Sequence, residues 1–184
     1  MLAQQKGDGD AGMRKAGFAN SPDISAVVPD FSRECKPWFA WDPARSLLAS
    51  LRSYQRHCSS RNPLRSIIKK IAVLRHRFWS VITGADVPLN CTIGGGLLMP
   101  HPNGIVIHPA AVIGPNCLIF QQVTIGQRSG GVPTIGGHVD IGAGAKILGR
   151  IDIGNHSVIG ANSVVLRNVP ERSTAVGIPA KVVR

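Results

Sequence analysis

Aliphatic residues recur every six positions through the C-terminal half of the chain. Ile or Val stands at positions 107, 113, 119 and 125, and again at 135, 141, 147, 153, 159 and 165. A mostly small residue follows each of them four positions later, and glycine often follows directly. This period fits neither an α-helix nor a simple strand alternation. It predicts a three-sided parallel coil whose aliphatic side chains fill the interior and whose corners use glycine.

The repeat is interrupted twice. Ile125 and Ile135 are ten positions apart instead of six, so we expect an insert at 126–134 to loop outward. Val87, Ile93 and Met99 keep the six-residue spacing, but the next series begins two positions out of phase, at Ile107. This second slip contains His101. A solenoid loses stacking where its repeat breaks, so both breaks are candidate functional sites.

A different pattern precedes the coil and divides the chain into three parts. Residues 1–36 are rich in Gly, Asp, Ser and Pro without a period, which predicts a flexible N-terminal arm. Residues 37–84 form a basic helical region, and residues 85–184 form the β-helix. Two helices are expected within 43–83, because Asp42-Pro43 is a start signal, Asn62-Pro63 is a break and Gly84 is a stop.

The formal net charge of +11 is concentrated in the helical region, where no acidic residue occurs between Asp42 and Asp86. A solvated basic face explains this most simply. Peripheral contact with a membrane surface is the next explanation, because Leu, Ile, Phe and Trp are interleaved with the charges. Nucleic acid is not favoured as a partner, since no binding motif accompanies the charge.

The sequence shows neither a signal peptide nor an apolar run long enough to span a membrane. The four cysteines, Cys35, Cys58, Cys91 and Cys117, are scattered without a CxxC pair, which argues against a disulfide framework or a zinc site. We therefore expect a cytoplasmic protein, with the inner face of the membrane as an option.

Three segments carry a resemblance to a known family. They are "DVPLNCTIGGGLLMPHPNGIVIHPAAVIG", "IGAGAKILGRIDIGNHSVIGANSVV" and the closing "VPERSTAVGIPAKVVR". Over about 86–184 the chain resembles the hexapeptide-repeat acyltransferases, and among them the serine acetyltransferases. The resemblance implies a mainly β fold, a left-handed parallel β-helix preceded by a short helical region. It also implies a homotrimer.

By this resemblance His101 is the catalytic base and Asp86, fifteen residues earlier, orients it. An imidazole can accept a proton near neutral pH while a hydroxyl attacks the thioester of acetyl-CoA. A carboxylate on the other ring nitrogen fixes the tautomer. No cysteine has a matching context, so we expect direct transfer rather than an acyl-enzyme.

The resemblance also assigns the acetyl-CoA site, which lies in this family between neighbouring subunits. The corresponding residues are Gly126, Gly142, Ala143, Gly144, Ala161, Asn162 and Lys181, with Arg184 as a further phosphate contact. Small residues there suit close approach of a ligand to the backbone, although corner geometry alone explains them equally well.

The remaining histidines raise the alternative of a metal site like that of the γ-type carbonic anhydrases, which share the β-helix. That family needs two histidines five residues apart, and no pair here has this spacing. We expect no metal, and place His108 and His156 at corners or on the surface.

The chain departs from the serine acetyltransferase pattern at two places that hold the amino acid in that family. Pro100 stands where Asp usually precedes the catalytic histidine, and "GGVPT" replaces an Arg-His pair near the end of the insert. The acceptor is therefore either L-serine, giving O-acetylserine for cysteine biosynthesis, or a sugar hydroxyl in exopolysaccharide biosynthesis. A non-catalytic β-helix scaffold is the remaining alternative.

Overall fold

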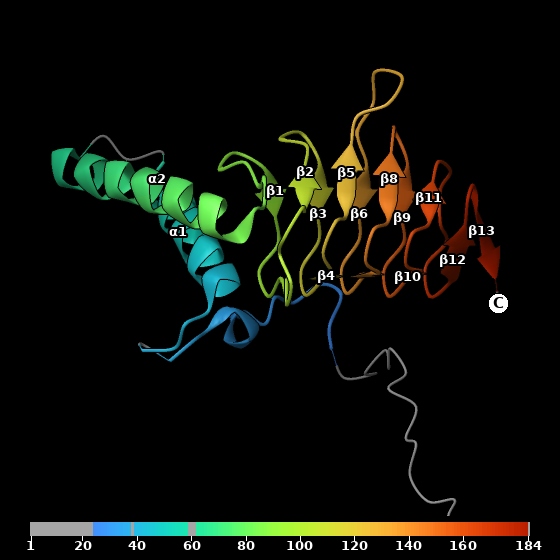
Figure 1. Cartoon of the computed structure of the whole chain (residues 1–184), viewed down its shortest axis with the longest axis horizontal. Helices are drawn as coiled ribbons and strands as arrows, with labels where there is room; N and C mark the ends of the chain where they lie inside the picture. Colours follow the sequence, from blue (N-terminus) through green and yellow to red (C-terminus); the bar gives the residue numbers. More distant parts are fainter. Residues whose placement is uncertain (1–23, 38, 59–61, 184) are drawn as a thin grey trace, which may run out of the picture.

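The chain forms a helical region at one end and a long β-solenoid at the other (Figure 1). The computed structural model describes residues 24–37, 39–58 and 62–183. A short 3₁₀ helix, η1 (Phe31–Glu34), comes first, and two α-helices follow, α1 (Pro43–His57) and α2 (Pro63–Thr83). None of the helices described is long and apolar enough to cross a membrane.

Side chains at the helix ends explain the helix boundaries, which the sequence predicted. The Asp42 carboxylate accepts a hydrogen bond from the Arg45 N–H at 2.9 Å, and the Asn62 amide oxygen accepts one from the Leu64 N–H at 2.9 Å. Gly84 ends α2 with φ of +64°, a conformation that glycine adopts without strain. All three predicted helix signals are confirmed.

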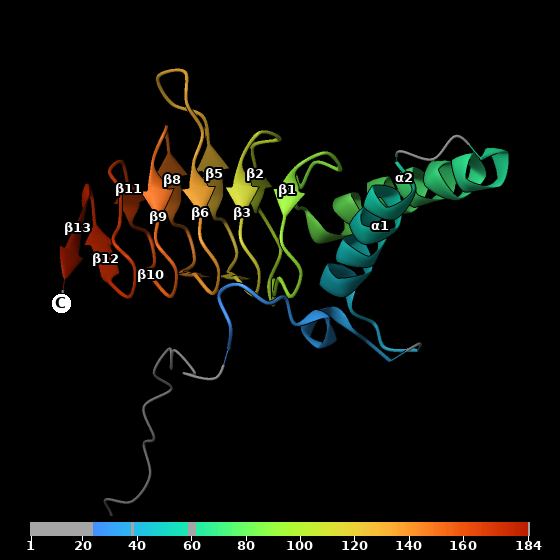
Figure 2. The same ribbon diagram turned by 180° about the vertical axis from the view of Figure 1, so that it is seen from behind.

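The solenoid has three faces, each a sheet of short strands that pair in parallel, except that the last pair, β12 and β13, is antiparallel (Figure 2). The first face consists of β1 (Thr92–Ile93), β3 (Val112–Ile113), β6 (Thr134–Ile135) and β9 (Asp152–Ile153). The second consists of β4 (Leu118–Ile119), β7 (Asp140–Ile141), β10 (Val158–Ile159), β12 (Thr174–Gly177) and β13 (Ala180–Val183). The third consists of β2 (Val106–Ile107), β5 (Thr124–Gly126), β8 (Lys146–Leu148) and β11 (Val164–Val165).

On each face, the interior aliphatic residue of one coil stacks on that of the next coil. Ile113 pairs with Ile135 on the first face, for example, and Ile119 with Ile141 on the second. Every Ile or Val of the series from Ile107 to Val165 is at most 2% exposed. The predicted fold, a parallel β-helix preceded by two helices, is confirmed.

The glycines that follow the aliphatic residues serve a purpose different from the one expected. They do not adopt left-handed backbone angles. A Cβ at Gly114 would instead lie 2.5 Å from the backbone of Gly136, and one at Gly142 would lie 2.6 Å from the Ala161 nitrogen. These glycines therefore permit close approach of neighbouring coils. Left-handed residues lie two positions after several of these glycines, at Asn116, His138, Gly144, His156 and Asn162.

Residues 24–37, which include the described part of the predicted N-terminal arm, lie against the solenoid. The Asn116 side chain donates hydrogen bonds to the carbonyls of Ser25 and Val28, and it accepts one from the Asp30 N–H at 2.8 Å. We call residues 24–37 the strap. The sequence predicted a flexible arm over 1–36, but residues 24–36 are packed because Asn116 satisfies three of their backbone groups. Residues 1–23 lie outside the described part.

The insert leaves the solenoid between β5 and β6 and projects outward, at the top of Figure 1. Arg128 and Gly131 exchange two backbone hydrogen bonds, of 3.0 and 3.1 Å, and so close it as a small hairpin. It stands at the edge where the third face turns into the first.

Candidate active site

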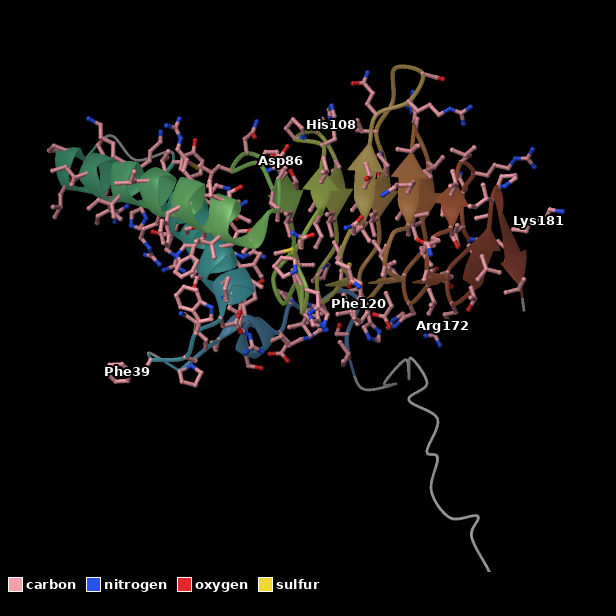
Figure 3. The ribbon with its side chains drawn as sticks, in the orientation of Figure 1. Phe39, Asp86, His108, Phe120, Arg172 and Lys181 are labelled. Carbon is pink, nitrogen blue, oxygen red and sulfur yellow. The ribbon has the colours of Figure 1, made fainter. Side chains whose placement is uncertain are left out.

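His101 and Pro102 are the two residues that put the repeat out of phase. Leu98 pairs with Leu118, and the Asn103 carbonyl accepts the Gln122 N–H at 2.9 Å. Pro100 therefore corresponds to Phe120 one coil later, and Asn103 to Gln121. The extra residues lie at the edge between the second and third faces, which we call the site edge. Phe120 marks this edge in Figure 3.

His101 is exposed and lines a pocket of about 670 Å³. The start of α1, the end of α2 and the first coil form its walls. Besides His101, the lining residues include Trp41, Asp42, Arg45, Leu48, Ile82, Leu97, Met99 and Asn103. The pocket is mainly apolar, and Asp42 and Arg45 are its charged groups.

Asp86 follows the end of α2 and begins the third face. It forms a parallel bridge with Val106, and its N–H donates to the Ile105 carbonyl at 2.8 Å. Its side chain is exposed and lines a second pocket, together with His76 and Ser80. Figure 3 shows it beside α2. Asp86 begins the first coil and His101 lies in the last turn of that coil. The two residues line different pockets, and among the described residues no hydrogen bond joins them.

Asp42 and Arg45 are pocket residues that the sequence analysis did not assign to the site. Their side chains form an ion pair at 3.3 Å and are 29% and 37% exposed. The Arg45 Nε also donates to the Arg33 carbonyl at 3.1 Å. Asp42 was interpreted only as a helix cap, a role it does fill. Its proximity to His101 depends on how α1 packs on the first coil, and no local sequence signal reports that.

Five of the residues predicted to bind acetyl-CoA lie on the site edge, in turns that follow the His101 turn. Gly142, Ala143 and Gly144 connect β7 to β8, and Ala161 and Asn162 connect β10 to β11. Backbone hydrogen bonds link these turns: the Gly144 N–H donates to the Gln121 carbonyl, and the Asn162 N–H to the Ala143 carbonyl. We call these turns the acetyl-CoA strip. It begins about two coils from the His101 turn, and neighbouring coils are roughly 4.8 Å apart.

The other predicted residues lie elsewhere. Gly126 ends β5 at the opposite edge of the third face, beside the insert. Lys181 is on β13 and pairs with Val176 on the last coil, at the far end of the solenoid in Figure 3. Arg184 lies outside the described residues.

The other solenoid histidines do not form a metal site. The Nδ1 atoms of His138 and His156 are 2.8 Å apart and share a hydrogen bond. His108 accepts the Ala110 N–H at 3.1 Å, on the edge that carries the insert. Within the part of the chain that the structure describes, no group of three or more His, Cys, Asp or Glu side chains could hold a metal ion.

The buried cysteines are poor nucleophiles. Burial raises the pKa of the Cys91 thiol to about 11 and that of Cys117 to about 12. A thiolate is the reactive form of cysteine, so neither residue is suited to carry an acyl group near neutral pH. Cys35 and Cys58 are exposed, and neither lines the His101 pocket.

No family model matches the chain. The serine acetyltransferase of Synechococcus elongatus is 44% identical over 107 residues, which are 56% of this chain and 44% of that protein. A solved serine acetyltransferase in complex with CoA is 35% identical with a TM-score of 0.64, over 78% of this chain and 58% of the other. The Neisseria gonorrhoeae serine acetyltransferase in complex with serine is 34% identical with a TM-score of 0.65, over 78% and 58%.

The chain spans about half the length of the curated relatives it matches. The match to solved structures extends beyond the hexapeptide repeat, since it covers 78% of the chain. The resemblance predicted from the repeat, the His101 turn and the closing GIPAKVV is confirmed: this chain is similar to the serine acetyltransferases in sequence and in fold.

Proposed function

We propose that the protein is an acetyl-CoA-dependent O-acetyltransferase that transfers the acetyl group to L-serine and forms O-acetylserine. The observation that carries this proposal is the position of His101. It is one of two residues inserted into an otherwise regular coil, and it lines a pocket on the same edge as the expected acetyl-CoA strip. The similarity to serine acetyltransferases, including solved complexes with CoA and with serine, supports the reaction type.

The residues of the site edge suit a thioester ligand. At Gly142, Ala143, Gly144 and Ala161 no side chain is longer than a methyl group, so a narrow chain can lie against the backbone. The Asn162 side chain is exposed at the same edge and can donate or accept a hydrogen bond. Gly126 and Lys181 are not on this strip, and a contact from them requires a neighbouring subunit or the far end of the ligand. We therefore include a homotrimer in the proposal.

The chemistry needs one proton acceptor. The His101 imidazole takes the proton of the acceptor hydroxyl as its oxygen attacks the thioester carbonyl carbon. The carbon–sulfur bond then breaks, and the imidazolium returns its proton to the departing CoA sulfur. Backbone N–H groups of the irregular turn stabilise the negative charge on the carbonyl oxygen. Asp86, at the start of the first coil, acts as a positioning residue and stabilises the imidazolium.

Serine needs partners for its ammonium and its carboxylate, and the pocket holds a charge of each sign. Asp42 can accept from the ammonium and Arg45 can bind the carboxylate. The two side chains already form an ion pair, so serine would insert its ammonium and carboxylate groups between the two charges. They replace the charged residues that are missing beside His101 and in the insert.

The test is turnover by the purified chain, measured as thiol release from acetyl-CoA with L-serine. His101→Ala should lower kcat by about 10²–10⁴-fold, the usual worth of a general base, while the circular dichroism spectrum stays unchanged. His108→Ala, a histidine on the opposite edge of the third face, is the matched control and should retain activity. Full turnover by His101→Ala would refute the proposal. A folded wild type that neither turns over nor binds acetyl-CoA would favour the scaffold alternative.

A sugar hydroxyl is the second candidate acceptor, and one observation favours it. Most of the pocket lining is apolar, and Trp41 at its rim is 75% exposed. A broad aromatic surface of this kind can hold a large, weakly charged ligand. Comparing kcat/KM for L-serine with a panel of sugars discriminates the two candidates, since only serine depends on both charges of the pocket.

A further inference from the structure

Helix α2 exposes a continuous apolar stripe to solvent. The stripe consists of Leu64, Ile67, Ile71, Leu74, Phe78 and Val81, which alternate at spacings of three and four residues. Leu64 is 65% exposed, Leu74 70% and Val81 82%. The opposite side of the helix is buried through Ala72, His76 and Thr83. The stripe is therefore a second apolar face that nothing in the described chain covers.

The stripe is long for an exposed surface. Helix α2 has 21 residues, which at 1.5 Å per residue is roughly 30 Å. Single exposed apolar residues are ordinary, but contiguous apolar patches on soluble chains mark interaction sites. The two views of the ribbon show α2 extending away from the solenoid, so much of its length has no β-helix beside it (Figures 1 and 2).

Cationic residues border the stripe on both sides. At 100° per residue, Lys70 and Arg77 project along one flank of the stripe and Arg75 along the other. All three are exposed, and among the described residues none takes part in a salt bridge. No acidic residue occurs between Asp42 and Asp86. The stripe and its flanks together thus present an apolar strip with positive borders and no negative charge.

We infer that this face of α2 docks on a membrane surface that contains anionic lipids. The helix lies in the plane of the surface, its apolar stripe enters the headgroup and acyl boundary, and Lys70, Arg75 and Arg77 contact lipid phosphates. Insertion across the bilayer is not involved, since α2 is not apolar enough to span it.

Charge argues against a second copy of the chain as the occupant. The three-four spacing would suit pairing of two α2 helices, and the flanking positions would then face each other across the seam. In both copies those flanks carry Lys70, Arg75 and Arg77 with no acidic residue to pair them. Such a pair would bring like charges together, whereas an anionic surface neutralises them.

Aromatic contacts connect the stripe to the His101 pocket. Phe78 packs edge-to-face on Trp79 with ring centroids 5.1 Å apart, and Trp79 packs on Trp41 at 5.6 Å. Trp41 lines the pocket, as does Ile82, the residue after the end of the stripe. Docking through α2 therefore brings the pocket mouth close to the lipid headgroups. The docking itself does not depend on the proposed reaction.

The experiment is co-sedimentation of the full chain with two kinds of vesicle, phosphatidylcholine alone and an equimolar mixture of phosphatidylcholine and phosphatidylglycerol. The wild type should bind the mixed vesicles and bind the neutral ones much more weakly. Arg75→Gln with Arg77→Gln should weaken binding roughly 25-fold, at about five-fold for each cation near an anionic surface. Leu74→Ser with Phe78→Ser should weaken it by roughly ten-fold or more.

Matched controls lie on the solenoid. Arg167→Gln removes an exposed cation and Val112→Ser an exposed aliphatic residue, and neither should change vesicle binding. Equal binding to both kinds of vesicle would overturn the inference, and so would unchanged binding by the stripe variant. Sedimentation velocity adds an independent outcome: a wild type that ignores vesicles but loses self-association in the Leu74→Ser, Phe78→Ser variant would assign the stripe to a second copy instead. Acetyl transfer is not the readout, so failure here leaves the proposed function untouched.

Discussion

The carboxylate of Glu34 and the guanidinium of Arg52 form an ion pair at 2.8 Å between the strap and α1. Glu34 Oε1 also accepts hydrogen bonds from the N–H groups of Gly96 and Leu97, at 2.8 and 3.1 Å. Arg52 in turn donates to the carbonyls of Ile93 and Gly94. This pair therefore fastens the strap and the helical region to the first coil.

Breaking this pair should destabilise the fold strongly. The side chains of Arg52 and Glu34 are only 14% and 8% exposed, so Glu34→Ala leaves a largely buried cation without its counter-charge and the N–H groups of Gly96 and Leu97 without their acceptor. We expect a loss of about 3–5 kcal/mol in the free energy of unfolding, measured by urea denaturation. Arg45→Gln breaks the more exposed Asp42–Arg45 pair and should cost about 1 kcal/mol or less. Equal losses in both variants would contradict this account.

Asn116 should hold the strap in place. Asn116→Gly keeps a residue that tolerates the observed φ of +60° but removes three hydrogen bonds to the strap. We expect a loss of roughly 2–4 kcal/mol and faster hydrogen exchange at residues 27–33. Gln122→Gly changes a residue with the same backbone geometry, at φ of +61°, without touching the strap. Strap exchange that is equally slow in Asn116→Gly would show that other contacts hold it.

Stability should fall as the pH drops below about 6.5, in part because of His138. Burial, together with His156 and Arg33 nearby, lowers the pKa of His138 from 6.5. The unfolded chain then binds a proton first, so the free energy of unfolding declines as the pH falls from 7 toward about 5. Burial lowers the pKa of His76 in the same direction, so the comparison must be with a variant.

His138→Asn provides that comparison, because Asn116 occupies the equivalent corner with a similar φ. Its unfolding free energy should decline less steeply over this pH range than that of the wild type. Parallel pH curves for the two proteins would show that His138 does not contribute. Thermal denaturation at a series of pH values measures the stability of both proteins.

Arg45 should decide the affinity for serine if serine is the acceptor. Arg45→Gln removes the cation that would bind the carboxylate, and we expect the KM for serine to rise roughly ten- to hundred-fold with kcat little changed. The KM for acetyl-CoA should stay the same. An unchanged KM for serine would place the amino acid elsewhere, and would turn attention to an uncharged acceptor.

Two glycines of the predicted acetyl-CoA site should behave differently when changed to alanine. At Gly142 the added methyl would meet the backbone of Ala161 at 2.6 Å, so Gly142→Ala should lose about 1–3 kcal/mol of stability. At Gly126 it would meet only side-chain methyl groups, Leu148 Cδ2 at 3.1 Å and Thr124 Cγ2 at 3.6 Å. Gly126→Ala should therefore fold normally, and its KM for acetyl-CoA should rise roughly ten-fold if the thioester passes there. An unchanged KM would remove Gly126 from the site.

The repeating part of the molecule was predictable because each coil repeats the same local requirement. An interior aliphatic residue at a fixed spacing, as at Ile119 and Ile141, directly indicates a coil. Asp42, Asn62 and Gly84 indicate the helix ends in the same way. The two-residue slip also located His101 correctly at an irregular turn. These features depend on residues close together in the sequence.

The remainder depends on contacts between distant segments. Asn116 and the strap are more than eighty residues apart, and nothing in the composition of 24–36 distinguishes a packed segment from a loose one. Asp42 enters the His101 pocket only because α1 packs on the first coil. The Asp42 carboxylate caps α1 and also lines the pocket. The sequence motif indicates the helix cap and gives no sign of the pocket contact.

The last strand described closes the second face of the solenoid. β13 turns back and pairs antiparallel with β12, with Val176 opposite Lys181, so on this face β12 does not offer a free parallel edge to a further coil. The helical region occupies the other end. Along the second face, the parallel stack of coils therefore cannot continue directly from β13 into a strand of another copy.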